Sequence, residues 1–456
     1  MIFTGWATPI ELLGAELIQR EYEGYPVPDS LRERVSDLDR EADAMNIAVI
    51  DPLFDELAGL RKSSDFPYSQ PNDLDGIRSE RADGPRQLGT VSQSEILDRL
   101  HGAWTGRACG CALGKPVEGV GMRGAKGMTG RQTIRAYLEN RGHWPLDFYF
   151  SGADAGDEIN IHCPLSQREN IAFMEPDDDI HYTLIALHVL ENHGADFTWR
   201  NVANAWNSCL PYNAICTAET QAILNYNNAS PRKAVTDWVT PEYTSTHRNP
   251  YREWIGAQIR ADGWGYACAG NPERAAEFAW RDAHWTHRAN GIYGEMLFAA
   301  ITAAAFVVSD PVELVEIGLS EIPRNSRLAE AGRSALKQAP ECSDFHDFMN
   351  WVDVHYGELS PVHTVNNALV VIGAIIFGQM DFHQSICSSV EGGWDTDCNG
   401  ATCGSIVGAA SGARGLNSSL VAPLHDTIKP KVFGFEEVSM AELAERTLTV
   451  HRNIVG

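Results

Sequence analysis

Apolar residues recur at intervals of three and four positions over most of the chain. This spacing places them on one face of an α-helix. Segments that alternate apolar and polar residues between tight turns, as antiparallel strands do, are scarce. The pattern predicts helices over residues 96–112, 180–192, 198–208, 272–282, 291–308, 311–319, 362–377 and 400–413. We therefore expect an all-α protein.

The first ninety residues differ in character from the rest. Residues 8–60 are rich in Leu, Glu, Arg and Ala at helical spacing, whereas residues 62–92 are polar and contain several Pro and Gly. The second segment is typical of a linker or surface loop. No period of 20–50 residues repeats along the chain, which excludes a solenoid. We predict a helical N-terminal extension with its linker, residues 1–93, and one large helical domain, residues 94–456.

Two of the predicted helices carry glycine at every fourth position. The two series are Gly102, Gly106, Gly110, Gly114 and Gly400, Gly404, Gly408, Gly412. Four residues are close to one helical turn, so each series forms a stripe along one helix face. Because glycine inside a helix costs about 1 kcal/mol relative to alanine, we expect each stripe to meet another helix backbone at close range. Such packing also holds the acidic residues that flank these helices in place.

The chain is strongly acidic, with 36 basic and 61 acidic side chains and a formal net charge of −25. A protein of this charge repels nucleic-acid backbones and anionic lipid unless it has a local basic patch, and the sequence shows none. We therefore expect no nucleic-acid partner. A small substrate, or a divalent cation that offsets some of the negative charge, fits the composition better.

The sequence also bears on the compartment. No stretch reaches the roughly 18–20 apolar residues that span a bilayer. The N-terminus has early acidic residues and no basic region before an apolar run, so we expect no signal peptide and no membrane partner. The ten cysteines include no CxxC pair. Free thiols in a reducing cytoplasm are the simplest account of them.

Two clusters of acidic residues each precede a predicted helix. The first is Glu-Pro-Asp-Asp-Asp at residues 175–179, and the second is Gly-Trp-Asp-Thr-Asp-Cys-Asn at residues 393–399. Capping requires only one carboxylate, and neighbouring carboxylates repel each other unless a cation is present. Carboxylate oxygens suit Mg²⁺ or Mn²⁺, and neither cluster has the spacing of an EF-hand loop. The residues alone leave two interpretations open, a shared metal site or unrelated capping acids.

Three segments together resemble the ADP-ribosylglycohydrolase family. They are GAWTGRACGCALGKPVEG at 102–119, PDDDIHYTLIAL at 176–187 and GWDTDCNGATCGSIVGAASG at 393–412. The resemblance implies a compact orthogonal bundle of α-helices with two divalent cations, Mg²⁺ or Mn²⁺, at the base of a cleft. The residues that match the metal-binding positions are Asp177, Asp178, Asp179, Asp395 and Asp397.

The resemblance also implies a reaction, the hydrolysis of a glycosidic bond at the anomeric carbon of an ADP-ribosyl group. Glu118 matches a glutamate that acts as a base or lies beside the metal, and we assign it a catalytic role together with Asp395. The segment IGAQIRADGWG at 255–265 and the Thr-His pair at 286–287 follow the order of the substrate-contacting segments. The predicted substrate-binding residues are Gly256, Arg260, Asp262 and His287.

Several positions depart from the family pattern. Cys111 replaces an aspartate, and Cys398 replaces a threonine that commonly binds metal. A thiol is a poor ligand for Mg²⁺, so Cys398 either leaves the coordination shell or shifts the preference toward a softer ion. Asp177 and Ile180 stand where the family has threonine. Asp262 brings a negative charge that is awkward beside a pyrophosphate.

These departures leave three alternatives for the function. The first is the same chemistry on a nucleoside, a nucleotide or another small N-riboside. The second is a catalytically silent member that binds ADP-ribose or a partner protein. The third is a metal-free glycosidase that uses two carboxylates.

Overall fold

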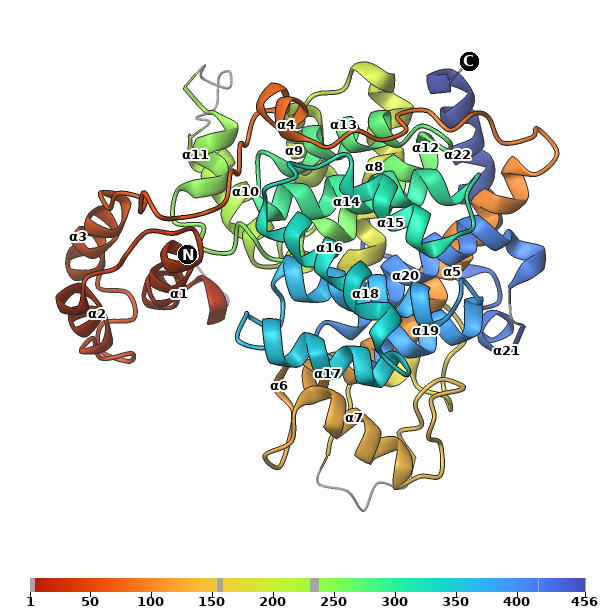
Figure 1. The fold of residues 1–456 in the computed structure, drawn as a ribbon, viewed down its shortest axis with the longest axis horizontal. Helices are drawn as coiled ribbons and strands as arrows, with labels where there is room; N and C mark the ends of the chain where they lie inside the picture. The colour runs from red at the N-terminus through yellow and green to blue at the C-terminus, as the bar shows by residue number, and fades with distance from the viewer. Residues whose placement is uncertain (1–4, 154–158, 230–237, 417, 456) are drawn as a thin grey trace.

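The computed structural model describes residues 5–153, 159–229, 238–416 and 418–455 (Figure 1). The extension contains α1 (Pro9–Tyr22), α2 (Asp29–Ser36), α3 (Ile47–Ala58) and α4 (Leu74–Glu80). The main domain contains α5 (Ile96–Gly114), α6 (Glu118–Arg123), α7 (Gly130–Glu139), α8 (Asp178–His193), α9 (Trp199–Cys209), α10 (Ala218–Ala229), α11 (Pro241–Thr246), α12 (Ala261–Ala267), α13 (Pro272–Ala283), α14 (Asn290–Ala305), α15 (Pro311–Leu319), α16 (Arg327–Gln338), α17 (Phe345–Tyr356), α18 (Thr364–Phe377), α19 (Phe382–Glu391), α20 (Thr396–Ser411), α21 (Ser418–Val421) and α22 (Met440–Val455). The strands among the described residues are β1 (Thr427–Ile428) and β2 (Val438–Ser439), which pair antiparallel.

The all-α prediction is confirmed, and each predicted helical range corresponds to a helix. The boundaries differ most for the last predicted helix, which begins at Thr396 and not at residue 400 because the second acidic cluster forms its first turn. The prediction missed shorter helices such as α7, α16 and α19, each of which packs a narrow apolar face on the bundle. Among the described residues, no helix combines the length and the apolar character needed to cross a lipid bilayer.

The two glycine-striped helices, α5 and α20, lie against each other at the centre of the bundle (Figure 1). A methyl group added to Gly106 would overlap the carbonyl of Gly404, and one added to Gly404 would overlap the carbonyl of Gly106. The same reciprocal contact joins Gly110 to Gly400. The close backbone approach that the stripes predict is therefore confirmed.

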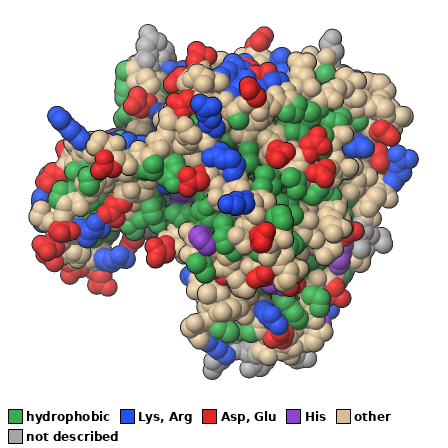
Figure 2. All heavy atoms as spheres, viewed as in Figure 1, with side chains coloured by type: hydrophobic (Ala, Val, Ile, Leu, Met, Phe, Trp, Pro, Cys, Tyr) green, Lys and Arg blue, Asp and Glu red, His purple; other side chains and the backbone are tan. Residues whose placement is uncertain are grey.

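The extension packs on one side of the main domain (left in Figure 1). Apolar residues of α1, α2 and α3 form a small core of their own, which includes Leu13 and Leu57 and is completed by Tyr251 of the main domain. Acidic and basic side chains are interspersed over the outer face of this lobe in Figure 2. The exposed charges and the separate core show that the extension is folded.

The segment predicted as a linker, residues 62–92, crosses the surface of the main domain and contains α4 (Figure 1). Tyr293 donates a hydrogen bond to the carbonyl of Pro71 at 2.5 Å, and the backbone N–H of Leu88 donates to the carbonyl of Gly270 at 2.9 Å. Arg86 also forms an ion pair of 2.9 Å with buried Glu321. The segment thus follows the surface of the main domain, includes a helix and is bonded to the domain at several points along its length.

Candidate metal centre

The first acidic cluster forms the N-terminus of α8. Asp177 is the N-cap, and its Oδ1 accepts a hydrogen bond from the backbone N–H of Asp179 at 3.0 Å, while Oδ2 forms an ion pair with Lys115. Asp179 is fully buried, with its Oδ1 3.3 Å from Nη2 of Arg107. Asp178 is half-buried between them. Asp177 caps the helix, so capping does not account for Asp178 and Asp179.

The second acidic cluster forms the first turn of α20. Gly393 and Trp394 both have positive φ angles, +74° and +55°, and turn the chain into the helix. A positive φ is unfavourable for tryptophan and persists only where the surrounding structure imposes it. Thr396 then donates a hydrogen bond of 2.8 Å to the carbonyl of Gly114 at the end of α5. Asp395, immediately before this threonine, is consequently held at a defined position beside α5.

Packing of α5 against α8 and α20 brings the two acidic clusters together. In three groups of residues, one metal-ligand atom of each side chain lies within 4.8 Å of the others. The groups are Cys111 with Asp177 and Asp179, Asp179 with Asp397 and Cys398, and Glu118 with Asp395 and Asp397. Because Asp179 and Asp397 each belong to two groups, the three groups form one continuous site, which we call the acid site.

Two oxygen atoms of the acid site lack a bonding partner. Asp179 Oδ2 and Asp397 Oδ1 are buried and have no hydrogen-bond partner within the part of the chain that the structure describes. A buried carboxylate oxygen without a partner is costly. A divalent cation bound between these oxygens would satisfy both, and oxygen-rich surroundings suit Mg²⁺ or Mn²⁺. The residues present therefore fit a divalent-cation site.

The mutual repulsion of these carboxylates is visible in their pKa values. Burial raises the pKa of Asp178 to about 8, and the charges of Asp177 and Asp397 add to the effect. Burial and the charge of Asp177 raise the pKa of Asp397 to about 6. The charge of Asp397, followed by burial, raises the pKa of Glu118 well above its usual range. A bound cation favours the ionised carboxylates and opposes these shifts.

One carboxylate is already compensated by the protein itself. Burial acts to raise the pKa of Asp177, but the ion pair with Lys115 outweighs it, and the pKa of Asp177 is lowered. The sequence pattern did not single out Lys115, although a lysine three residues before Glu118 could have been recognised as a candidate partner for the acidic residues. It also missed Arg107, which lies within the first glycine stripe and contacts Asp179. Both cations became recognisable only when the helices were packed.

Arg260, predicted to contact substrate, lies at the end of a 3₁₀ turn (Gln258–Arg260) and is buried. Its guanidinium forms ion pairs of 2.6 Å with Glu219, 2.9 Å with Asp282 and 3.3 Å with Glu295. The charge of Arg260 is therefore balanced by carboxylates of the protein.

The other predicted substrate-binding residues lie beside this ion-pair network. Asp262 is fully buried and bonded to Arg107 at 2.6 Å, so its negative charge is compensated within the fold. Gly256 lies against the carboxylate of Glu219, where a Cβ would not fit. His287 Nε2 is 3.7 Å from the same carboxylate and has no hydrogen-bond partner among the described residues. Arg107 thus links Asp262 to Asp179 of the acid site.

The fold and this site define a class of protein, an all-α bundle in which carboxylates from the N-termini of α8 and α20 meet a glutamate from the first turn of α6. A family model described as ADP-ribosylglycohydrolase matches residues 92–453. A solved structure described as an ADP-ribosylglycohydrolase-related protein complex is similar to the chain with a TM-score of 0.50 and 20% identity, over 79% of this chain and 99% of that chain. Among curated proteins, none matches. The chain belongs to the ADP-ribosylglycohydrolase family.

Proposed function

We propose that this protein is a divalent-cation-dependent hydrolase that cleaves the glycosidic bond between ribose and its substituent, in an ADP-ribosylated substrate or a related N-riboside. The observation that supports the proposal most directly is the convergence of Glu118, Asp179, Asp395 and Asp397 on one buried site. Membership of a glycohydrolase family supports the same reaction type.

We propose that the acid site binds two divalent cations, Mg²⁺ or Mn²⁺. The residues that would hold them are Asp177, Asp178, Asp179, Asp395 and Asp397. When bound, such cations orient hydroxyl groups and water and act as Lewis acids. The helix N-termini of α8 and α20 fix the positions of these carboxylates, so little rearrangement is needed for binding.

We assign the proton transfer to Glu118. In the proposed reaction a water oxygen forms a bond to the anomeric carbon as the bond from that carbon to the substituent breaks. Glu118 takes the proton from the water and passes it to the departing nitrogen or oxygen, so the carboxylate is regenerated and no net proton is consumed. Asp397 and burial raise the pKa of Glu118 above its usual range, which makes its carboxylate a stronger base toward the water. The carboxylate of Asp395 stabilises positive charge that develops on the ribose ring.

Gly256, Arg260, Asp262 and His287 stay as proposed substrate-binding residues. Arg260, Asp262 and His287 are buried and Gly256 lies against Glu219, which favours a role in shaping the wall of the substrate cleft. His287 Nε2 and Asp262 Oδ1 have no hydrogen-bond partner among the described residues and can still bond a ligand. The ten cysteines are all free thiols, which supports the proposed cytoplasmic location.

The proposal is tested by assaying the full chain with ADP-ribosyl-arginine, ADP-ribosyl-serine and a panel of nucleosides, each with Mg²⁺, Mn²⁺ or EDTA. We expect turnover that EDTA abolishes and that Asp397→Asn reduces by a factor of about 100 or more. Asp83→Asn, at an exposed position, is the control for the same change of charge. Turnover of nucleosides alone would support the small N-riboside alternative. Turnover in EDTA would support a metal-free glycosidase. The absence of turnover under every condition would support a catalytically silent binding protein.

A further inference from the structure

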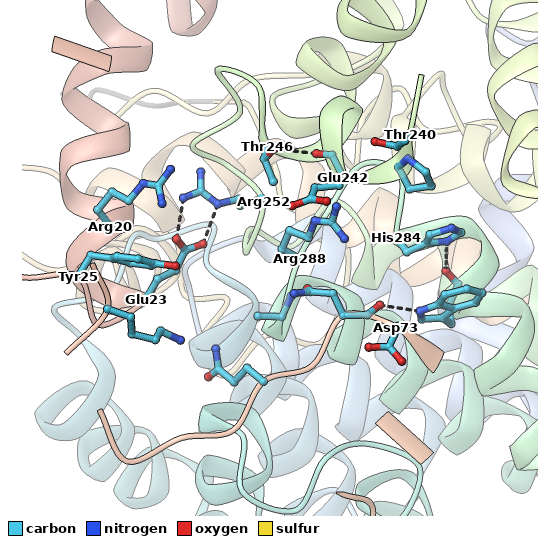
Figure 3. Close-up of a pocket in the computed structure, with 16 residues that line it drawn as sticks. Arg20, Glu23, Tyr25, Asp73, Thr240, Glu242, Thr246, Arg252, His284 and Arg288 are labelled. Atoms are coloured by element: carbon cyan, nitrogen blue, oxygen red, sulfur yellow. Dashed lines mark hydrogen bonds and ion pairs between the residues drawn. The ribbon is translucent and has the colours of Figure 1, made fainter. Parts of the chain in front are cut away.

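A pocket lies between the N-terminal extension and the main domain (Figure 3). Its volume is about 700 Å³, within the range of small-molecule sites. Arg20 and Lys62 of the extension line it, together with Glu242, Arg252, His284 and Arg288 of the main domain. None of these residues belongs to the acid site, so the pocket is a separate feature.

Four cationic side chains line this pocket in a protein whose net charge is −25. Two of them are paired with carboxylates of the protein itself. Arg252 forms ion pairs of 2.6 Å with Glu16 and 2.7 Å with Glu23, and Arg20 is 2.7 Å from Glu16. The remaining two are Lys62 of the extension and Arg288 of the main domain. Neither has a carboxylate partner at ion-pair distance among the described residues.

The first of these cations is Arg288. Its Nη2 is buried and has no hydrogen-bond partner in the part of the chain that is described. Burial is the main reason that the pKa of Arg288 is lowered to about 10, and the nearest opposing charge, Glu242, only partly offsets it. Figure 3 shows the Arg288 guanidinium in the middle of the pocket, beside Glu242 but not bonded to it. A guanidinium in this state has hydrogen-bond capacity that an anion would satisfy.

The second cation is Lys62, at the rim. Its Nζ lies 4.2 Å from the ring centre of Phe66 and 5.9 Å from that of Tyr25, with no carboxylate oxygen within ion-pair distance among the described residues. On the opposite wall, the ring of His284 stacks flat on Trp280 at 4.1 Å. The pocket therefore combines two unneutralised cations with polar and aromatic walls.

We propose that this pocket binds a small organic phosphate of about nucleotide size, with the phosphate held by Arg288 and Lys62 across the boundary between the extension and the main domain. Arginine offers a planar set of donors that matches phosphate oxygens, and lysine adds a point charge. A ligand that contacts both side chains would connect the extension, through Lys62, to the main domain, through Arg288.

The test is calorimetric titration of the full chain with pyrophosphate and with AMP, in EDTA so that no cation bound at the acid site can recruit phosphate. We expect a Kd of about 1 mM or tighter for at least one probe. Arg288→Gln and Lys62→Gln should each weaken binding by about tenfold or more. Arg333→Gln and Lys337→Gln, at exposed positions outside the pocket, remove the same charge and should leave Kd unchanged.

Three results would overturn the proposal. The first is that neither probe binds. The second is that the control variants weaken binding as much as the pocket variants do. The third is that Asp397→Asn abolishes binding whereas Arg288→Gln does not. Citrate serves as a carboxylate comparator, and binding of citrate without either phosphate compound would contradict the assignment of the ligand. Lys62→Gln changes an exposed side chain, so it keeps the test valid even where Arg288→Gln does not fold.

Discussion

Glu118 occupies the first turn of α6, and one of its oxygens lies within 4.8 Å of carboxylate oxygens of Asp395 and Asp397. We predict that Glu118→Gln lowers kcat by a factor of about 100–10,000 with a small effect on KM, because an amide cannot accept the proton of the attacking water. Cation binding measured by calorimetry should change much less. Exposed Glu33→Gln is the control. Full turnover in Glu118→Gln would remove Glu118 from the proposed mechanism.

Cys398 is grouped with an aspartate of each acidic cluster, since its Sγ lies within 4.8 Å of oxygens of Asp179 and Asp397. Burial raises the pKa of this thiol well above its usual value, so a cation must displace its proton to bind sulfur. We predict that Co²⁺ added to the wild type produces a near-ultraviolet thiolate charge-transfer band, because thiolates favour softer ions than Mg²⁺.

The band should disappear in Cys398→Ser and persist in Cys268→Ser, which alters another buried thiol. A wild-type protein that binds Co²⁺ without this band would show that Cys398 has left the coordination shell. The measurement requires no substrate, and it therefore separates metal binding from catalysis.

At the scale of elements, the pair α5 and α20 positions the acid site. The carbonyl of Gly404 lies where a side chain of Gly106 would be, so we predict that Gly106→Ala destabilises the protein by about 1–3 kcal/mol despite the better helix propensity of alanine. Gly14 lies in α1 with no atom within 4 Å of an added Cβ. Gly14→Ala should therefore stabilise by about 0.5–1 kcal/mol. Urea unfolding measures both, and equal effects would contradict the packing argument.

At the scale of the molecule, buried charge joins the extension to the main domain. Arg252 bonds Glu16 of α1 and Glu23, the residue that caps the end of α1. We predict that Arg252→Gln costs about 3–5 kcal/mol and exposes the extension to proteases, because it removes the buried guanidinium that pairs with both carboxylates. Arg34→Gln breaks the exposed pair with Glu56 and should cost less than about 1 kcal/mol. Similar losses in the two variants would show that the junction does not depend on these pairs.

Glu253, at the same junction, gives a dependence on pH. Burial acts to raise its pKa, but Arg327 outweighs this, with His363 and a hydrogen bond from Asn290 adding to the effect, and the pKa of Glu253 is well below 4.5. Gln19 of α1 also donates to it at 2.8 Å. A carboxyl group with a lowered folded-state pKa contributes stability above its unfolded pKa of about 4.3 and loses it as the pH falls further.

We therefore predict that the difference in unfolding free energy between wild type and Glu253→Gln is largest near neutral pH and shrinks below about pH 4.3. Chemical denaturation at a series of pH values measures it. Glu33→Gln, at an exposed position, should show no such trend. A constant difference over this pH range would mean that the folded-state pKa of Glu253 is not lowered.

Local patterns along the sequence were sufficient for much of this protein. Helical periodicity determined the all-α class, and the four-residue spacing of glycines such as Gly106 and Gly404 determined that two backbones approach closely. Both follow from the geometry of a helix, in which spacing along the chain translates directly into a face. The acidic clusters around Asp179 and Asp397 were recognisable because two or more neighbouring carboxylates exceed what a helix cap requires.

Only the tertiary structure decided how these pieces combine. The partners of Asp177 and Asp262, Lys115 and Arg107, come from another helix, and no spacing in the sequence relates them. The enclosure of Arg260 by carboxylates and the pocket around Arg288 arise where segments distant in sequence meet. Such contacts depend on how complementary surfaces pack between segments distant in sequence. They also depend on burial, which sets how strongly charged groups interact. Neither is encoded in any single segment.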